Sequence, residues 1–361
     1  MAIRVAVVGV GFGTTVHVPA FVSEGLEVVA VMARRRERAE EAAATFGIDE
    51  IFTDFGALLE MADLDAVSIA TPTALHYEMA TAALRAGKHV ICEKPFALNV
   101  AQAKEMADLA ESSGLTAMIA HEFRFASGRM FVKSLLDEGY VGDPKIALLR
   151  LIRGPVAAPS GEIPEYVAGR DAASEGAGFL FGLGSHYIDG LRHWFGEVEE
   201  VSGTLLTTTP NRRQGNETVL ADADDAFVFT LRFASGAIAE MVATRGAPFA
   251  DESTIAIYGN GGTLVTPQHG FNPPAHGLVL GGRLGAASGL EELKVPADFE
   301  PFTDDRDDRL MPFRIFTREF VRGVETGTSP APNFVDGYRC QQVLDAIRES
   351  SATGRRVQIA E

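Results

Sequence analysis

A glycine-rich turn directly after the first apolar run constrains the fold more than any other feature of the chain. Residues 3–8 are apolar enough for a buried strand, and residues 9–14 read Gly-Val-Gly-Phe-Gly-Thr before a helical pattern begins. The first glycine permits the tight turn, and the second lets the backbone approach a pyrophosphate held at the helix N-terminus. Thr14 stands where the usual pattern has its third glycine, but the strand–turn–helix setting still predicts a dinucleotide-binding domain. The predicted contacts are Gly9, Gly11, Phe12, Gly13 and Thr14.

The residues after the second predicted strand bear on which dinucleotide is bound. An NAD site usually carries an acid there, which binds the ribose hydroxyls. This chain instead reads Ala33-Arg34-Arg35-Arg36, and a small residue followed by arginine suits the 2′-phosphate of NADP. We therefore expect NADP to be preferred over NAD, with Arg34 as the main phosphate contact. The alternative is that these arginines only begin an exposed helix.

Strand-like and helix-like patterns alternate through the first third of the chain. The apolar runs lie at residues 3–8, 27–32, 66–70, 89–91 and 116–120. The helical patterns between them lie at residues 37–45, 55–61, 76–86 and 100–113. This alternation predicts a parallel, doubly wound sheet with helices on both faces, which is a Rossmann domain over residues 1–123.

The pattern changes after about residue 125. Strand candidates lie at residues 145–153, 226–234, 237–244 and 253–258, and the turns near them read Ala-Ser-Gly and Asn-Gly-Gly. Helical patterns lie at residues 130–138, 185–195, 313–325 and 335–353, while residues 207–225 and 267–289 are predicted loops. The expected class is α/β, with a C-terminal α+β domain over residues 124–361 that binds substrate on a mainly antiparallel open sheet.

Composition argues against several kinds of partner. Asp and Glu number 49 against 32 Lys and Arg, and the net charge of −17 would repel nucleic acid or an anionic membrane. Two cysteines, Cys92 and Cys340, cannot form a disulfide framework, so we expect a cytoplasmic location. We expect no membrane-spanning segment, no signal peptide before the first strand and no metal site.

Two polar segments follow predicted strands of the first domain. Thr71-Pro72 ends one strand, with His76 just beyond, and Glu93-Lys94-Pro95 follows the next strand. Open α/β sheets bind ligands at the carboxyl ends of their strands. A lysine there, close to a nicotinamide, is suited to proton transfer, although most lysines are solvated surface charges.

These segments occur in the order typical of one enzyme family. With His17 after the glycine turn, and with residues 121–125, 184–189 and 345–357, the chain resembles the glucose–fructose oxidoreductase and inositol dehydrogenase family, Gfo/Idh/MocA. The resemblance covers essentially the whole chain. It implies an NAD(P)-dependent oxidoreductase that transfers a hydride between nicotinamide C4 and the carbinol or carbonyl carbon of a sugar, cyclitol or related polyol.

The resemblance also assigns roles to individual residues. Lys94 would be the acid–base catalyst and a ligand of the substrate hydroxyl, and His186 would be a second catalytic residue at the same hydroxyl. Arg124 and Asp189 would help to bind substrate. The further cofactor contacts would be Thr71, Pro72, His76, Glu93 and Lys94. Two plainer alternatives exist, because Arg124 would also suit an ion pair between domains and His186 would also suit helix packing.

One position departs from the family's pattern. The family often carries Asp four residues before the histidine, on the same helix face, where this chain has Gly182. The apolar residues 179–181 beside it suit a less polar carbonyl compound. Asp189, three residues after His186, is a possible replacement for the missing carboxylate. We expect Asp189 to be structural instead, with His186 donating a hydrogen bond while Lys94 moves the proton.

Three functions and one assembly follow from these observations. Besides a polyol oxidoreductase, the chain suits an NADPH-dependent reductase or diol dehydrogenase acting on a less polar, non-sugar substrate. A non-catalytic dinucleotide-binding sensor is favoured by Gly182 and opposed by Glu93-Lys94-Pro95 and His186. In each case we expect a homodimer or homotetramer through the C-terminal sheet, because the Phe, Val, Ile and Met residues of strands 226–234 and 237–244 need cover.

Overall fold

The structure is a computed structural model that describes residues 2–154, 165, 171–274, 276–286 and 289–359. The chain divides into two compact units. The first unit is Met1–Phe125 with Asp304–Gln341, and the second is Ala126–Thr303 with Gln342–Glu361. Within the described residues, every helix is too short or too polar to cross a membrane.

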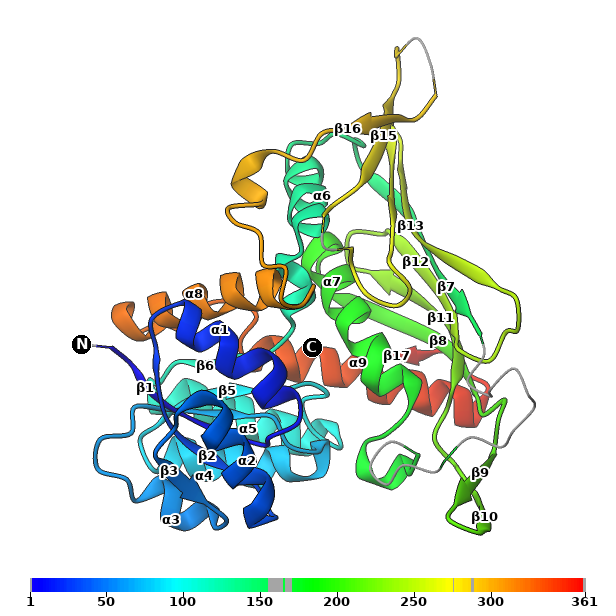
Figure 1. Cartoon of the computed structure of the whole chain (residues 1–361). Helices are drawn as coiled ribbons and strands as arrows, with labels where there is room; N and C mark the ends of the chain where they lie inside the picture. The colour runs from blue at the N-terminus through cyan, green and yellow to red at the C-terminus, as the bar shows by residue number, and fades with distance from the viewer. Residues whose placement is uncertain (1, 155–164, 166–170, 275, 287–288, 360–361) are drawn as a thin grey trace. The chain divides into compact units, whose positions relative to one another are not determined.

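The first unit is built on a six-stranded parallel sheet (Figure 1). Its strand order is β3-β2-β1-β4-β5-β6, the doubly wound order of a dinucleotide-binding fold, so the predicted Rossmann domain is confirmed. Its strands are β1 (Arg4–Val8), β2 (Glu27–Met32), β3 (Glu50–Phe52), β4 (Ala66–Ile69), β5 (His89–Cys92) and β6 (Ala117–Ile119).

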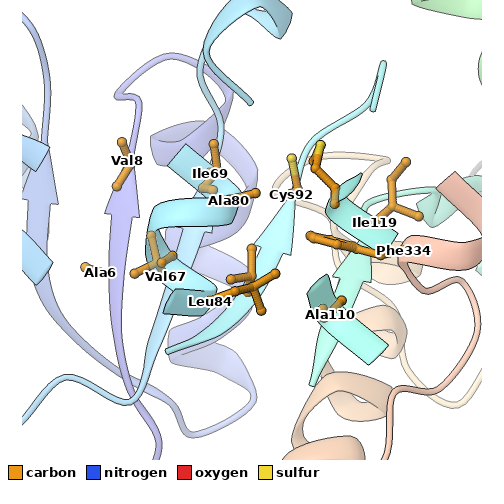
Figure 2. Packing of buried hydrophobic residues seen from close by; sticks show 14 of the residues in the cluster. Ala6, Val8, Val67, Ile69, Ala80, Leu84, Cys92, Ala110, Ile119 and Phe334 are labelled. Carbon is orange, nitrogen blue, oxygen red and sulfur yellow. The ribbon is translucent and has the colours of Figure 1, made fainter. Parts of the chain in front are cut away.

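Helices cover both faces of this sheet. Successive strand residues point to opposite sides, and the side chains on both sides are buried. Ala6 and Val8 of β1 belong to one buried cluster, part of which is shown in Figure 2, and Val5 and Val7 belong to another. The helices are α1 (Val18–Ser23), α2 (Arg36–Phe46), α3 (Phe55–Leu59), α4 (His76–Arg85), α5 (Val100–Ser113), α8 (Leu310–Thr326) and the first part of α9 (Phe334–Thr353).

Residues 304–341 lie in the first unit, whereas the sequence prediction placed them in the C-terminal domain. Their helix α8 buries Phe313, Phe316 and Phe320 in the cluster that contains Val7. An amphipathic pattern predicts the helix but does not say which core receives its apolar face. The boundary between the units therefore falls inside α9.

The second unit holds a nine-stranded sheet and a separate hairpin. The strand order of the sheet is β16-β15-β14-β13-β7-β12-β11-β8-β17, and apart from the parallel pair β7–β12 its named neighbours are antiparallel, as predicted. The strands of the sheet are β7 (Pro144–Arg153), β8 (Val198–Leu206), β11 (Ala226–Phe233), β12 (Ile238–Thr244), β13 (Asp251–Gly259), β14 (Gly262–Pro267), β15 (Val279–Arg283), β16 (Glu291–Leu293) and β17 (Val357–Gln358). The hairpin is β9 (Asn211–Gln214) with β10 (Glu217–Leu220), and the helices are α6 (Ser127–Asp137), α7 (Ser185–Phe195) and the last part of α9.

One face of the large sheet is packed and the other carries partly exposed side chains. The phenylalanines of β11 and Met241 of β12 are buried, so the Phe and Met residues that suggested an exposed apolar face point inward instead. On the outer face Tyr258, Ile146 and Ile238 stand directly opposite one another across β13, β7 and β12. These three are 40%, 46% and 43% exposed and form what we call the outer row.

Two segments predicted to be loops contain strands. The hairpin β9–β10 lies within residues 207–225, and β15 lies within residues 267–289. The sequence of β9 is Asn-Arg-Arg-Gln and that of β15 contains two glycines, so neither shows the apolar alternation that predicts a strand. The three-residue strand β3 was missed as well, because such a short run carries little periodicity.

Candidate functional site

The glycine-rich turn after β1 packs closely against its neighbours at two positions and is open at a third. Gly9 has a φ of 106°, and a Cβ there would lie 2.2 Å from the carbonyl oxygen of Ala70. A Cβ at Gly13 would lie 2.7 Å from Cγ1 of Val7. A Cβ at Gly11 would meet no described atom within 4 Å. The space beside Gly11 therefore fits the approach of a pyrophosphate to the backbone.

Thr14 departs from the usual glycine pattern, and its surroundings explain why the turn accepts it. The close helix–strand contact that the third glycine normally makes is made here by Gly13 against Val7. The Thr14 hydroxyl donates a hydrogen bond of 2.7 Å to the carbonyl oxygen of Val10, so its side chain is satisfied within the turn.

The arginines after β2 fall into two groups. Arg36 pairs with Glu40 at 2.9 Å, and the next arginine along α2, Arg38, likewise pairs with an acid of the same helix. Arg34 and Arg35 are exposed, and neither has a carboxylate partner among the residues that the structure describes. Arg34, the residue predicted to bind the 2′-phosphate, is therefore not paired with an acid among the described residues.

His76 links the two segments that follow β4 and β5. The ring is 1% exposed, with Nδ1 2.8 Å from the carbonyl oxygen of Pro95 and Nε2 2.9 Å from that of Thr71. Burial lowers the pKa of His76, which favours the neutral ring that donates to one carbonyl at a time. The predicted cofactor contacts Thr71 and His76 are thus brought next to the Glu93–Pro95 segment by hydrogen bonding within the protein.

Glu93 and Lys94 follow β5, the strand that pairs with β4. One carboxylate oxygen of Glu93, Oε1, lies 3.0 Å from Nε2 of His17, and the other, Oε2, accepts the backbone N–H of Lys94 at 3.2 Å. Burial raises the pKa of Glu93, but the hydrogen bond from His17 and the charge of Lys94 outweigh it and hold the pKa below its usual value. The buried carboxylate of Glu93 therefore holds the backbone of the half-buried Lys94.

Glu122 is a buried acid that the sequence prediction did not assign to the site. It begins the short helical segment Glu122–Phe125 and is 2% exposed. Burial and the charge of Glu93 raise the pKa of Glu122 to about 8, against the opposing charges of Lys94 and Arg309. The raised pKa favours the protonated carboxyl, whose O–H can donate a hydrogen bond. Nothing local in the sequence signals this, because the burial comes from tertiary packing.

Arg124 forms a buried ion pair within the first unit. Its Nη2 lies 2.9 Å from Oδ1 of Asp336, near the start of α9. The other oxygen, Oδ2, accepts the backbone N–H of Asn333 at 2.9 Å. This ion pair lies within one unit rather than between domains, and a contact of Arg124 with substrate stays a prediction.

Both candidate residues of the second unit lie on α7. His186 and Asp189 are buried, and their spacing of three residues places them on the same side of the helix. The π-helical segment Leu180–Gly184 leads into α7, and Gly182 in it is exposed. A Cβ at Gly182 would meet nothing within 4 Å in the described chain, so packing leaves room for the family's Asp at this position.

The segment before α7 is held by Asp224, which the sequence prediction also missed. Its carboxylate accepts the N–H of Leu180 at 2.7 Å, and its carbonyl accepts the N–H of Phe179 at 2.8 Å. Burial raises the pKa of Asp224 to about 6. Phe179 packs on Phe227 and Phe271, with ring centroids 5.7 and 5.0 Å away, so this apolar residue belongs to the core of the unit.

Comparison with protein families matches both parts of the chain. Residues 3–121 match the model of the oxidoreductase family's NAD-binding Rossmann fold, labelled Gfo/Idh/MocA. Residues 133–359 match the model of the same family's C-terminal alpha/beta domain. Together the two matches span nearly the whole chain.

Curated relatives and solved structures agree with these matches. Levoglucosan dehydrogenase of Pseudarthrobacter phenanthrenivorans is 29% identical over 88% of this chain and 85% of its own. Myo-inositol 2-dehydrogenase of Thermotoga maritima is 25% identical over 99% of both chains. A solved structure of levoglucosan dehydrogenase in complex with NADH and levoglucosan is 26% identical over 100% of both chains, with a TM-score of 0.88.

Proposed function

The chain belongs to the Gfo/Idh/MocA oxidoreductase family, and from that premise we propose an NADP-preferring enzyme that acts on a hydroxyl-bearing carbon of a sugar, cyclitol or related polyol. Relatives named for levoglucosan, D-glucosides and myo-inositol support this substrate class. One observation carries the proposal. The glycine-rich turn after β1 and Lys94 after β5 lie at the same carboxyl edge of one parallel sheet, where such sheets bind ligands.

The residues present at this edge fit a nicotinamide dinucleotide. The backbone of Gly9–Gly13 would hold the pyrophosphate beside Gly11, and Thr71 and Pro72 would border the site after β4. When bound, the dinucleotide supplies a hydride donor or acceptor at nicotinamide C4. The protein therefore has to orient it, exclude water and manage the hydroxyl proton of the substrate.

A preference for NADP is supported by the two exposed arginines after β2. Arg34 and Arg35 are free of the intrahelical ion pairs that occupy Arg36 and Arg38 among the described residues. A 2′-phosphate would give Arg34 a charge-assisted partner, and NAD has no phosphate at that position. The expected outcome is tighter binding of NADPH than of NADH.

We assign the proton to Lys94, whose amine would take it from the substrate hydroxyl during oxidation and return it during reduction. Glu93 remains ionised and holds the backbone of Lys94. The raised pKa of Glu122 favours its protonated form, which cannot act as a competing base. In the second unit we assign a hydrogen-bonding role toward substrate to His186, and we keep Asp189 structural.

A turnover screen tests this function. Sugars, cyclitols and linear polyols are offered with NADP and with NAD, and ketoses and simple ketones are offered with NADPH, while absorbance at 340 nm is followed. We expect NADP reduction with at least one cyclic polyol. Turnover confined to non-sugar ketones would favour the less polar substrate class, and NADPH binding without any turnover would identify a sensor.

We also propose that the enzyme is a cytoplasmic homodimer or homotetramer that covers the outer row of the second unit. Tyr258, Ile146 and Ile238 would lose their exposed apolar surface against a second copy. Light scattering at micromolar concentration should give at least twice the 38.6 kDa of one chain. A monomer at that concentration would contradict the assembly.

A further inference from the structure

We infer that His17 is a positioning residue that holds Glu93 and, through it, the backbone of Lys94. No role follows for His17 from the sequence, beyond its place after the glycine-rich turn. The inference rests on the proposed function, since it matters for turnover only if Lys94 acts on the substrate.

The surroundings of the His17 ring fix which nitrogen carries the proton. The ring is fully buried, with Nε2 3.0 Å from Oε1 of Glu93 and Nδ1 2.7 Å from the hydroxyl oxygen of Ser68. A carboxylate only accepts hydrogen bonds, so Nε2 is the donor toward Glu93. The Ser68 hydroxyl can donate to Nδ1 or accept from it, so it suits both the neutral and the charged ring.

Glu93 passes this hydrogen bond on to Lys94. Its second oxygen accepts the backbone N–H of Lys94 at 3.2 Å, so one carboxylate joins the His17 ring to the proposed acid–base residue. A buried carboxylate that loses its partner either protonates or rotates toward another donor. Either change weakens the bond to the Lys94 amide and frees the half-buried lysine to move.

The same ring also packs against the dinucleotide-binding turn. Phe12 of the turn meets His17 edge-on at 5.5 Å between ring centroids, and Phe313 of α8 lies at 4.4 Å. His17 ends the π-helical segment Gly13–His17, which begins directly after Phe12, and such segments often occur at functional sites. One imidazole thus touches the turn that would hold the dinucleotide and the carboxylate that holds Lys94.

The charges around Glu93 predict the direction in which the pH dependence of turnover changes when His17 is removed. His17, Lys94 and His76 favour its ionised form, and the charge of Glu93 in turn raises the pKa of the neighbouring acid Glu122. Removing His17 takes away the first of the favourable partners, so burial dominates and the pKa of Glu93 rises. Glu93 then protonates at higher pH, and the acidic limb of the pH–rate profile should move to higher pH.

The test compares His17→Leu with His89→Leu in the full-length protein. His89 lies at the other end of β5, where its Nδ1 accepts the backbone N–H of Thr116 at 3.0 Å, so the control also removes a partly buried histidine with a hydrogen bond. We expect His17→Leu to lower kcat by about 10- to 100-fold, the range for losing the outer partner of an active group, and to shift the acidic limb. His89→Leu should do neither, and His17→Gln should recover part of kcat because its amide can donate to Glu93.

Two readouts on the protein without substrate keep the inference separate from the proposed function. Nitrogen-15 NMR of the imidazoles should show the His17 signal changing in Glu93→Gln, and NADPH fluorescence should show that His17→Leu still binds dinucleotide. Should His17→Leu fail to fold, Glu93→Gln carries the test, because its amide does not titrate and the acidic limb assigned to Glu93 should disappear. A wild type that binds NADPH but turns over nothing defeats the proposed function, while the NMR result still reports the pair.

Three results would overturn the inference. A folded His17→Leu with the wild-type kcat and pH profile would show that Glu93 does not need the histidine. Equal losses in His17→Leu and His89→Leu would reduce its role to general stability. An unchanged His17 signal in Glu93→Gln would show that the two side chains are not paired.

Discussion

The segment after β5 and the segment that leads into α7 both carry candidate catalytic residues, but the protein fixes them to different degrees. After β5, Glu93 is held by His17 and by the Lys94 amide, and a Cβ on nearby Gly9 would run into Ala70. Before α7, Gly182 is exposed and has space around it among the described atoms. The first segment is therefore tied to the dinucleotide-binding fold, whereas at Gly182 in the second segment a side chain can be added without damage to the fold.

The largest expected effect concerns the segment after β5 and is the loss of kcat in Lys94→Ala. Positioned acid–base groups contribute about 10²- to 10⁴-fold to rate, so kcat should fall by that factor while NADPH still binds. Lys88→Ala is the matched control, because Lys88 donates to the carbonyl oxygen of Leu64 at 2.8 Å just before β5. Steady-state kinetics and NADPH fluorescence measure the two effects, and a wild-type kcat in Lys94→Ala would remove this residue from the mechanism.

A pair of glycine substitutions tests the contrast in backbone constraint. Gly9→Ala combines a φ of 106° with a contact 2.2 Å from Ala70, and strain of about 1–3 kcal/mol would weaken dinucleotide binding by about 5- to 150-fold. Gly182→Ala should leave dinucleotide affinity and melting temperature unchanged, because no described atom lies within 4 Å of the new Cβ. Titration with NADPH decides, and similar behaviour of the two variants would erase the contrast.

Substitutions of the arginines after β2 test which dinucleotide the first unit prefers. Arg34→Ala should weaken NADPH by about 10- to 100-fold, the loss of roughly 1.5–3 kcal/mol expected for a charge-assisted hydrogen bond, and should leave NADH unchanged. Arg36→Ala is the control, because Arg36 already pairs with Glu40. Equal weakening of both dinucleotides, or a wild type that prefers NADH, would show that Arg34 does not read the 2′-phosphate.

The contrast also explains which features the sequence could predict. The glycine turn, β2 and the polar segment after β5 depend on local backbone demands, so pattern alone located them. The role of Glu122 depends on burial created by other segments, and Arg124 meets Asp336 from 212 residues away in the chain. The packing of α8 in the first unit was not predicted for a related reason, since its buried phenylalanines predict a helix without naming its core.

The smallest expected effect concerns the start of the second segment. The pKa of Asp224 is raised from 3.8 to about 6, so the stability linked to its protonation is complete below about pH 4 and is lost as the pH rises through 6. Asp224→Asn keeps an acceptor for the Leu180 N–H and lacks this titration. Its free energy of unfolding should exceed that of the wild type by about 1–3 kcal/mol at pH 8 and match it near pH 4. Denaturant unfolding at the two pH values measures this, and a variant less stable at pH 8 would show that the charge is needed.

The central claim is that this chain moves a hydride between a hydroxyl-bearing carbon and a nicotinamide dinucleotide. The most direct measurement offers NADP with a polyol substrate from the screen, deuterated at its carbinol carbons, and examines the reduced dinucleotide by mass spectrometry. We expect one deuterium in the NADPH formed by the wild type and reduction slowed by about 10²- to 10⁴-fold in Lys94→Ala. Reduced dinucleotide without deuterium, or deuterium transfer by Lys94→Ala at the wild-type rate, would contradict it.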